Sequence, residues 1–208
     1  MNFRNLLVAF VCVAIAAPVF ANLPDPALST ASSYGSEVSV FTLPNGTGQP
    51  LTAAKLEAGG EVDATIDVTL LNALGNPIAL YPAEDLWLET SLGGLTACVG
   101  GNIADAPTDG SGQTTFSSAL FGGGYSDRVG GEVTRVIING VAMVGSDMAI
   151  LFNSADIDGS LTVDLSDTVA FVPLYTGAYD YAVDFFFDGV INLSDLVKYA
   201  GGLNATCP

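Results

Sequence analysis

Two stretches near the C-terminal end repeat the same spacing of aspartates, and they constrain the folding of this chain more than any other feature. DIDGSLTVDLSD begins at Asp156 and DFFFDGVINLSD begins at Asp184, 28 residues later. Residues 154–208 hold eight aspartates and one lysine. Such carboxylates must remain in water, pair with the few cations or bind a metal ion, because an isolated buried charge is costly. The repeat therefore predicts a pair of metal-binding loops.

The first loop offers oxygen at every position that an EF-type calcium loop uses. Those positions are 1, 3, 5, 7, 9 and 12, and position 7 ligates through its backbone carbonyl. Leu161 stands at position 6, where glycine normally makes the sharp turn, so the backbone geometry of this loop is left open. The predicted Ca²⁺ ligands are Asp156, Asp158, Ser160, Thr162, Asp164 and Asp167.

The second loop keeps the turn and loses a ligand. Gly189 stands at position 6, but Phe186 stands at position 3 and has no side-chain oxygen. We therefore expect a second site that is weaker than the first, or empty. The three phenylalanines at 185–187 are expected to fold over the β-rich part of the chain or over the first repeat. The remaining candidate ligands are Asp184, Asp188, Val190 through its carbonyl, Asn192 and Asp195.

A helix is predicted after each loop. The first is expected to begin at Ser166 and to stop near Pro173, and the second to begin at Ser194 and to end at 201–202, a pair of glycines. Twin calcium loops, each followed by one helix and each ending in L-S-D, resemble the type I dockerin module over residues 154 to about 203. This resemblance implies Ca²⁺ as the cofactor.

The dockerin resemblance also implies a protein partner. Dockerins attach their host protein to a cohesin domain, often on the scaffold of a polysaccharide-degrading complex, and their partner contacts cluster at loop positions 10 and 11. A serine before an aspartate is equally suited to cap a helix N-terminus. A second interpretation is that the module clips onto the rest of its own chain. The candidate partner-binding residues are Leu165, Ser166, Leu193 and Ser194.

Residues 36–153 show the pattern of short β-strands. In GEVDATIDVTLLN, at 60–72, apolar residues alternate with polar ones, which is typical of a half-buried antiparallel strand. Five more runs of this kind are separated by Gly, Asn, Pro and Ser. The predicted fold class is mainly β, an antiparallel β-sandwich followed by a small helical pair of calcium loops.

Two turn motifs make the β part similar to a known family. VTLLNALGNPI at 68–78 and TDGSGQTTFS at 108–117 resemble the bacterial Ig-like domains of the invasin/intimin type. The resemblance implies an Ig-like spacer or presentation domain with no catalytic residues. Its glycines supply the positive φ angles that tight turns require.

The N-terminal residues predict export. Arg4, the apolar run LLVAFVCVAIAA and the sequence V-F-A at 19–21 are typical of a secretory signal peptide. No later segment is long enough to span a membrane. We therefore expect a secreted protein, extracellular or at the cell surface, with a signal peptide at 1–21, an N-terminal segment at 22–35, the Ig-like β-sandwich at 36–153 and the dockerin-like module at 154–208.

Two cysteines remain after the signal peptide. Cys98 and Cys207 form an even pair in an oxidising compartment, so we expect a disulfide between them, with two separate buried thiols as the alternative. The bond would join the penultimate residue to the middle of the chain.

Charge and composition exclude several functions. The formal charge is −17, which repels nucleic acid and anionic membranes. The chain has no histidine, so it has no Ser-His-Asp or Cys-His catalytic system. Glu84, Asp85 and Glu89 flank Trp87, but this arrangement equally suits a solvated sheet face. We expect a non-enzymatic protein of extracellular assembly. The alternative is a carbohydrate-binding or adhesion module, accessory to polysaccharide degradation.

Overall fold

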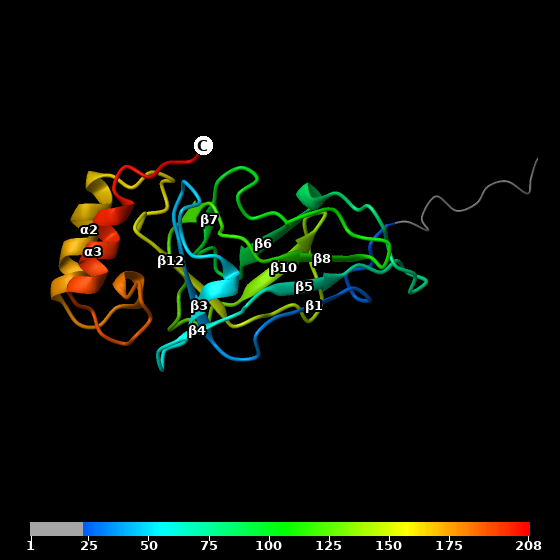
Figure 1. The fold of residues 1–208 in the computed structure, drawn as a ribbon, viewed down its shortest axis with the longest axis horizontal. Helices are drawn as coiled ribbons and strands as arrows, with labels where there is room; N and C mark the ends of the chain where they lie inside the picture. Colours follow the sequence, from blue (N-terminus) through cyan, green and yellow to red (C-terminus); the bar gives the residue numbers. More distant parts are fainter. Residues whose placement is uncertain (1–22) are drawn as a thin grey trace, which may run out of the picture.

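The computed structural model describes residues 23–208, so the expected signal peptide lies outside the described residues. An elongated β-rich body carries two helices at one end (Figure 1). Within the described range, no helix has the length and apolar character needed to cross a membrane. The strands are β1 (Thr30–Ser32), β2 (Val38–Thr42), β3 (Ala54–Lys55), β4 (Glu61–Val62), β5 (Ile66–Thr69), β6 (Leu86–Thr90), β7 (Thr96–Ala97), β8 (Gln113–Phe116), β9 (Gly122–Gly123), β10 (Thr134–Ile138), β11 (Val141–Ala142) and β12 (Ile150–Ser154). The helices are η3 (Leu51–Ala53), η4 (Ala83–Asp85), α2 (Leu165–Thr176), η5 (Tyr181–Val183) and α3 (Leu193–Gly202).

The strands form four small sheets. Their orders are β1-β5-β8, β11-β10-β6, β12-β2-β3-β4 and β7-β9. The predicted class, a mainly β sandwich followed by a small helical part, is confirmed. One strand pair departs from the antiparallel pattern, because β12 pairs with β2 in parallel, with Ile150 opposite Val38. Strand β12 then leads directly into the first aspartate loop.

The alternating segment at 60–72 buries the face that its sequence predicts. Ala64, Ile66, Val68 and Leu70 are all buried. The segment is two strands, β4 and β5, because the Asp63 carboxylate accepts hydrogen bonds from the backbone and side chain of Thr65 and turns the chain between them. Strand β1, within the segment 22–35, pairs with β5 and extends this sheet.

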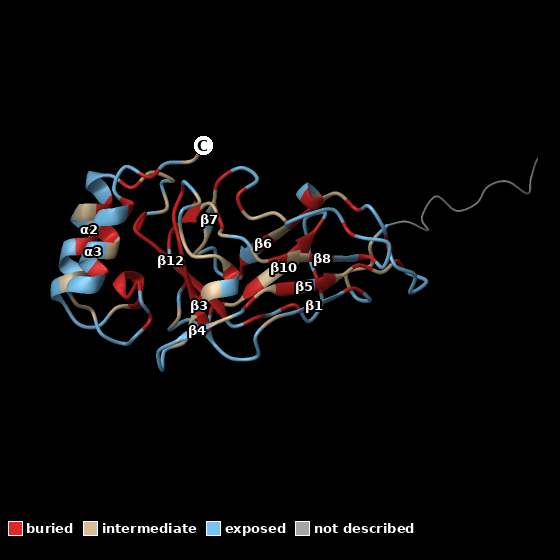
Figure 2. Ribbon diagram, viewed as in Figure 1, coloured by how far each residue is buried: buried red, intermediate tan, exposed pale blue. Residues whose placement is uncertain are grey.

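Residues 23–208 form two principal apolar cores. The larger lies between the sheets of the sandwich and includes Val40, Leu88 and Phe152. The second joins the sandwich to the helical end, because Phe41 and Leu43 around β2 pack with residues of the C-terminal module. Buried segments accordingly continue from the strands into the inner sides of α2 and α3 (Figure 2). The module residues of this core are Ala155, Ile157, Val163, Phe171, Ala182, Val183, Phe185, Tyr199 and Ala205.

Both predicted helices are present, and the end of the first was predicted wrongly. Helix α2 continues through Pro173 to Thr176. Proline removes one hydrogen bond but has a φ angle compatible with a helix, and this one is exposed to solvent. Helix α3 includes both of its glycines. A Cβ at Gly202 would lie 2.8 Å from the Cβ of Ala155 and 2.9 Å from Cδ2 of Leu43, so glycine allows the helix end to pack against the sandwich.

The predicted disulfide between Cys98 and Cys207 is confirmed. The two Cα atoms lie 5.8 Å apart, and 109 residues separate them in sequence. Closing a loop of this length removes entropy from the unfolded chain worth about 4.7 kcal/mol in the chain-entropy model. The bond therefore fixes the end of the module to the sandwich.

Candidate metal site and its attachment to the sandwich

Three carboxylates of the first loop converge. Oxygens of Asp156, Asp158 and Asp167 all lie within 4.8 Å of one another. Asp156 and Asp167 are fully buried, and Asp158 is exposed. Among residues 23–208, no other set of three acidic, histidine or cysteine side chains meets in this way. The folding of the loop thus brings positions 1, 3 and 12 together.

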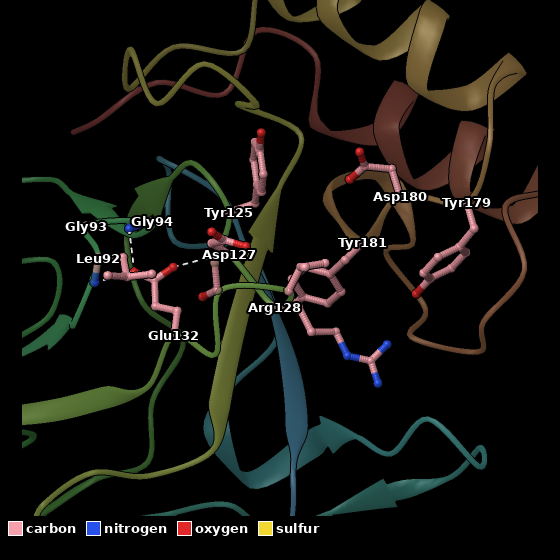
Figure 3. A pocket seen from close by; sticks show the side chains of 12 residues that line it. Leu92, Gly93, Gly94, Tyr125, Asp127, Arg128, Glu132, Tyr179, Asp180 and Tyr181 are labelled. Carbon is pink, nitrogen blue, oxygen red and sulfur yellow. Dashed lines mark hydrogen bonds between the residues drawn. The ribbon is translucent and has the colours of Figure 1, made fainter.

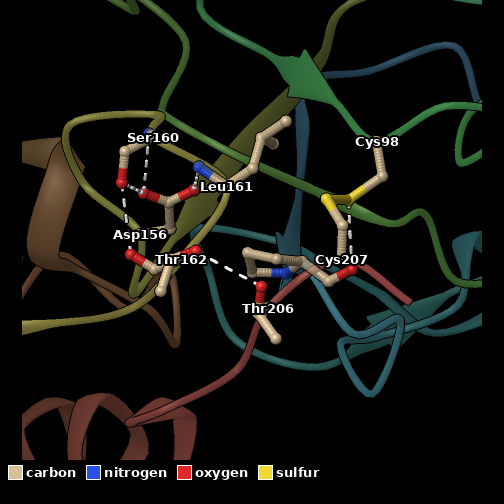
Figure 4. Close-up of a disulfide and its surroundings, with 8 residues drawn as sticks. Cys98, Asp156, Ser160, Leu161, Thr162, Thr206 and Cys207 are labelled. Atoms are coloured by element: carbon tan, nitrogen blue, oxygen red, sulfur yellow. Dashed lines mark hydrogen bonds between the residues drawn. A yellow bond between two sulfur atoms is a disulfide. The ribbon is translucent and has the colours of Figure 1, made fainter.

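The other predicted ligands of the first loop lie in different settings. The Ser160 hydroxyl lies 3.4 Å from Asp156 Oδ1 and 3.2 Å from the Thr162 carbonyl oxygen, so position 5 lies between positions 1 and 7 (Figure 4). Asp164 is the N-cap of α2, because its Oδ1 accepts the backbone N–H of Ser166 at 2.7 Å. Position 9 of the loop is therefore the N-cap residue of helix α2.

The turn geometry left open at Leu161 is resolved by its backbone. Both loops have left-handed residues at positions 4 and 6. In the first loop these are Gly159 at φ 67° and Leu161 at φ 68°, and in the second Phe187 at φ 54° and Gly189 at φ 77°. Each loop thus has one glycine and one bulky residue at the two positions. A left-handed leucine costs about 1–2 kcal/mol, and the rest of the loop must supply that energy.

The second loop has the same backbone and fewer converging acids. Asp184 and Asp195 are fully buried. Oxygens of Asp184 accept backbone N–H groups of Asp188 at 3.2 Å and Gly189 at 2.9 Å. Phe186, at the third position, is 37% exposed and lies against Lys198. Two buried carboxylates therefore remain where the first loop gathers three acids.

Burial disfavours the charged form of the loop carboxylates. Desolvation raises the pKa of Asp156 to about 6, and the nearby charge of Asp167 adds to the increase. Desolvation also raises the pKa of Asp195. Without a bound cation, these groups lose solvation without gaining a counter-charge.

The cations of the chain lie against other groups. Among residues 23–208, the lysines and arginines form no ion pair with a loop carboxylate. The Lys198 ammonium instead donates to the carbonyl of Phe185 at 2.8 Å. The loop carboxylates of residues 23–208 are therefore left without a side-chain counter-charge. The ion pairs are Lys55 with Glu61, Arg128 with Glu37 and Glu57, and Arg135 with Asp147.

The interpretation of the two loop serines as helix N-caps was wrong. Asp164 and Asn192 cap the helices, and each makes a capping box with the aspartate three residues later. Carboxylate and amide oxygens at position 9 reach the backbone of the first turn, where they satisfy free N–H groups. Ser166 and Ser194 are consequently exposed. Their neighbours Leu165 and Leu193 are 75% and 67% exposed.

Two phenylalanines attach the second loop to the sandwich. The ring of Phe185 meets that of Phe41 edge-on at 5.2 Å. Phe187 packs with Leu151 and Tyr181, and the guanidinium of Arg128 lies 4.9 Å from its ring centre. Both are buried, whereas Phe186 between them is partly exposed. The expected packing over the sandwich thus holds for the first and third residues of the run.

The chain after α3 connects the first loop to the disulfide. Val163 donates its N–H to the Ala205 carbonyl at 2.8 Å, and Asn204 donates to the Val163 carbonyl at 2.9 Å. Cys207, two residues after Ala205, bonds to Cys98 (Figure 4). The disulfide therefore holds the first loop as well as the end of the chain.

Sequence reasoning missed Gly123, which lies against the first loop. A Cβ at this position would lie 1.8 Å from Oδ2 of Asp156. The next residue, Gly124, donates its backbone N–H to the Asp156 carbonyl at 2.6 Å. The signal in the sequence is the run GGGY at 122–125, because adjacent glycines indicate close approach of another part of the chain.

Of the carboxylates around Trp87, Glu84 lines the same surface hollow as the indole ring. The indole N–H donates to Oε1 of Glu89 at 2.7 Å, and the ring is half-buried at the edge of a shallow hollow of about 300 Å³. Asp85 belongs to η4, ahead of the strand that carries Trp87. The arrangement is that of a sheet surface.

Comparisons with known proteins identify no family for this chain. No family model and no curated protein matches the sequence. Among solved structures, the filamin domain of Lin-41 is similar at 14% identity, over 61% of this chain and 95% of that domain, with a TM-score of 0.30. A likeness at that level carries no argument about function. The dockerin resemblance stays a prediction from the loop sequences.

We predict that Gly123→Ala destabilises the protein while Gly110→Ala does not. The new methyl group must displace the buried Asp156 carboxylate, and overpacking of this kind costs about 1–3 kcal/mol. Gly110 has open space around the same position. Urea unfolding measures both variants against the parent protein. Equal free energies of unfolding for the two variants would contradict the close contact.

Proposed function

We propose that residues 154–208 form a calcium-binding, dockerin-like module in a secreted, non-catalytic protein of extracellular assembly. The observation that carries this proposal is the convergence of Asp156, Asp158 and Asp167 with no cation of residues 23–208 paired to them. Two fully buried carboxylates within 4.8 Å repel one another, so binding of a divalent ion removes an energetic cost that the fold otherwise bears.

The chemistry of the donor set favours calcium. All of the groups that meet are oxygens, which hard cations prefer. Zinc sites are usually built with histidine or cysteine, but the chain has no histidine and both cysteines of residues 23–208 form the disulfide. The carbonyl of Thr162 and the hydroxyl of Ser160 extend the set towards the six to eight oxygens that calcium takes.

The module combines features of the two interpretations that the sequence left open. Phe185, Phe187 and the disulfide fix it to the sandwich, as a clip requires. The predicted partner residues nevertheless remain free, because Leu165 and Leu193 lie on the outer sides of the helices. The sandwich therefore holds the module rigidly while its helices face solvent.

The free surface is an apolar stripe on each helix. On α2, Leu165, Val169 and Val172 are 75%, 69% and 53% exposed, and they recur at helical spacing. On α3, Leu193 and Val197 occupy the equivalent positions 28 residues later and are 67% and 64% exposed. Exposed apolar stripes of this kind are typical of protein interaction sites. A cohesin-like domain is the partner that the loop sequences suggest.

We predict one tight calcium site, which Asp156→Ala abolishes. Isothermal titration of the metal-free protein is expected to give a stoichiometry of about one, because only the first loop gathers three carboxylates. Calcium at ten times its Kd should stabilise the folded protein by about 1.4 kcal/mol. No binding by the parent protein, or two equal sites, would contradict this prediction.

A gain-of-ligand variant tests the second loop in the same titration. Phe186→Asp supplies an oxygen at position 3 and should raise the stoichiometry to about two. Phe186→Leu is the matched control, since it changes the same exposed position without adding an oxygen. A stoichiometry that stays at one in both variants would show that the buried acids of the second loop do not form a site.

We predict that a cohesin domain binds the calcium-loaded protein through the helix stripes. Surface plasmon resonance against a panel of purified cohesin domains, with calcium and with EDTA, measures the interaction. Leu165→Asp together with Leu193→Asp should weaken it by about 100-fold, because charges would enter an apolar contact. Val141→Asp, on the sandwich and 54% exposed, should have no effect. The docking role is contradicted if no cohesin binds, or if binding withstands both EDTA and the double substitution.

A further inference from the structure

A hollow of about 840 Å³ lies where the sandwich meets the module, apart from the helix stripes and from the first loop. Tyr125, in the loop after β9, lines it from the sandwich, and Tyr179 and Asp180, ahead of η5, line it from the module (Figure 3). Arg128 and Tyr181 lie between the two sides. The volume of the hollow is within the range of ligand pockets in proteins.

Two aromatic rings of the hollow are available to a ligand. Tyr125 is 39% exposed and Tyr179 is 46% exposed. The hydroxyl of Tyr179 donates to Oδ2 of Asp184 at 2.9 Å, which fixes the position of this ring. Tyr181 has a structural role instead, since it is buried and its hydroxyl shares a hydrogen bond of 2.7 Å with Ser39.

The charged groups of the hollow offer acceptors and no free cation. Arg128 is held by Glu37 and Glu57, each at 2.8 Å. Asp127 and Asp180 each use Oδ1 for a backbone N–H, from Gly130 at 2.7 Å and Ala182 at 3.0 Å. Their Oδ2 atoms add acceptor oxygens at the wall.

A third carboxylate completes this electrostatic picture. Glu132 is buried, and its oxygens accept backbone N–H groups of Leu92 at 3.0 Å, Gly94 at 2.8 Å and Asp127 at 2.6 Å. Desolvation alone would raise the pKa of Glu132, but these hydrogen bonds outweigh it and lower the pKa. Glu132 therefore keeps a negative charge beside the hollow. An anionic ligand would therefore meet three carboxylates and one arginine that is already paired twice.

We propose that this hollow binds a neutral oligosaccharide. The C–H faces of pyranose rings pack on tyrosine rings, and sugar hydroxyls donate to carboxylates in charge-assisted hydrogen bonds. Both features are present on opposite sides of one hollow of suitable volume. This site goes beyond the calcium module, and a failure here leaves the calcium and docking proposals untouched.

The test is a titration of the calcium-loaded, full-length secreted protein with five pentasaccharides. Cellopentaose, xylopentaose and mannopentaose are the neutral probes, a pentagalacturonate is the anionic probe and a glucosamine pentamer is the cationic probe. At least one neutral sugar should bind. Tyr125→Ala and Tyr179→Ala should each weaken that binding by about tenfold, which is the size of one lost stacking contact.

Three further variants test which groups of the hollow contribute to sugar binding. Tyr34→Ala removes a tyrosine of the same 39% exposure outside the lining of the hollow and should leave the affinity unchanged. Tyr179→Phe keeps the ring but loses the hydrogen bond to Asp184 that fixes it, so it should bind more tightly than Tyr179→Ala and more weakly than the parent. Asp180→Ala removes an acceptor and should also weaken binding.

Three results would overturn the proposal. They are no binding of any neutral sugar, binding of the anionic or the cationic pentamer in place of the neutral ones, and binding that is unchanged in both alanine variants of the hollow. A circular dichroism melt of each variant, compared with the parent, shows that a loss of affinity comes from the missing ring.

Discussion

The C-terminal module is organised around buried carboxylates with which no lysine or arginine of residues 23–208 forms an ion pair. Asp156, Asp167, Asp184 and Asp195 are all fully buried, and backbone N–H groups satisfy part of their hydrogen-bonding capacity. Hydrogen bonds alone do not neutralise charge, and the raised pKa of Asp156 reflects the remaining cost. A cation bound as proposed for the first loop would offset that cost.

The sandwich contributes directly to that burial. Gly123 lets a strand approach the Asp156 carboxylate, and Gly202 lets the end of α3 approach Leu43. Phe41 extends the module's core from its own strand, and the disulfide closes the far side of the first loop. The module is therefore part of a single folded unit, and its two helices are oriented by the sandwich.

The sequence predicted the features that follow from local pattern. Alternation identified the buried face of 60–72, and the cysteine count identified the disulfide. The aspartate spacing named a larger set of candidate ligands, of which Asp156, Asp158 and Asp167 converge. Prediction from the sequence failed for features that are determined by tertiary packing. Helix α2 continues through Pro173 because this residue is exposed to solvent. Asp164 caps α2 because the loop geometry brings its carboxylate to the first turn of the helix. The parallel pairing of β12 with β2 joins segments more than 100 residues apart, beyond the reach of local pattern.

Hydrogen exchange of the full chain, measured by mass spectrometry in calcium and in EDTA, tests most directly whether the buried loop carboxylates require a cation. We expect the amides of residues 156–203 to be protected in calcium and to exchange faster by at least about tenfold in EDTA, while strands β5, β6 and β10 keep their protection. Equal protection of residues 156–203 in the two conditions would contradict it.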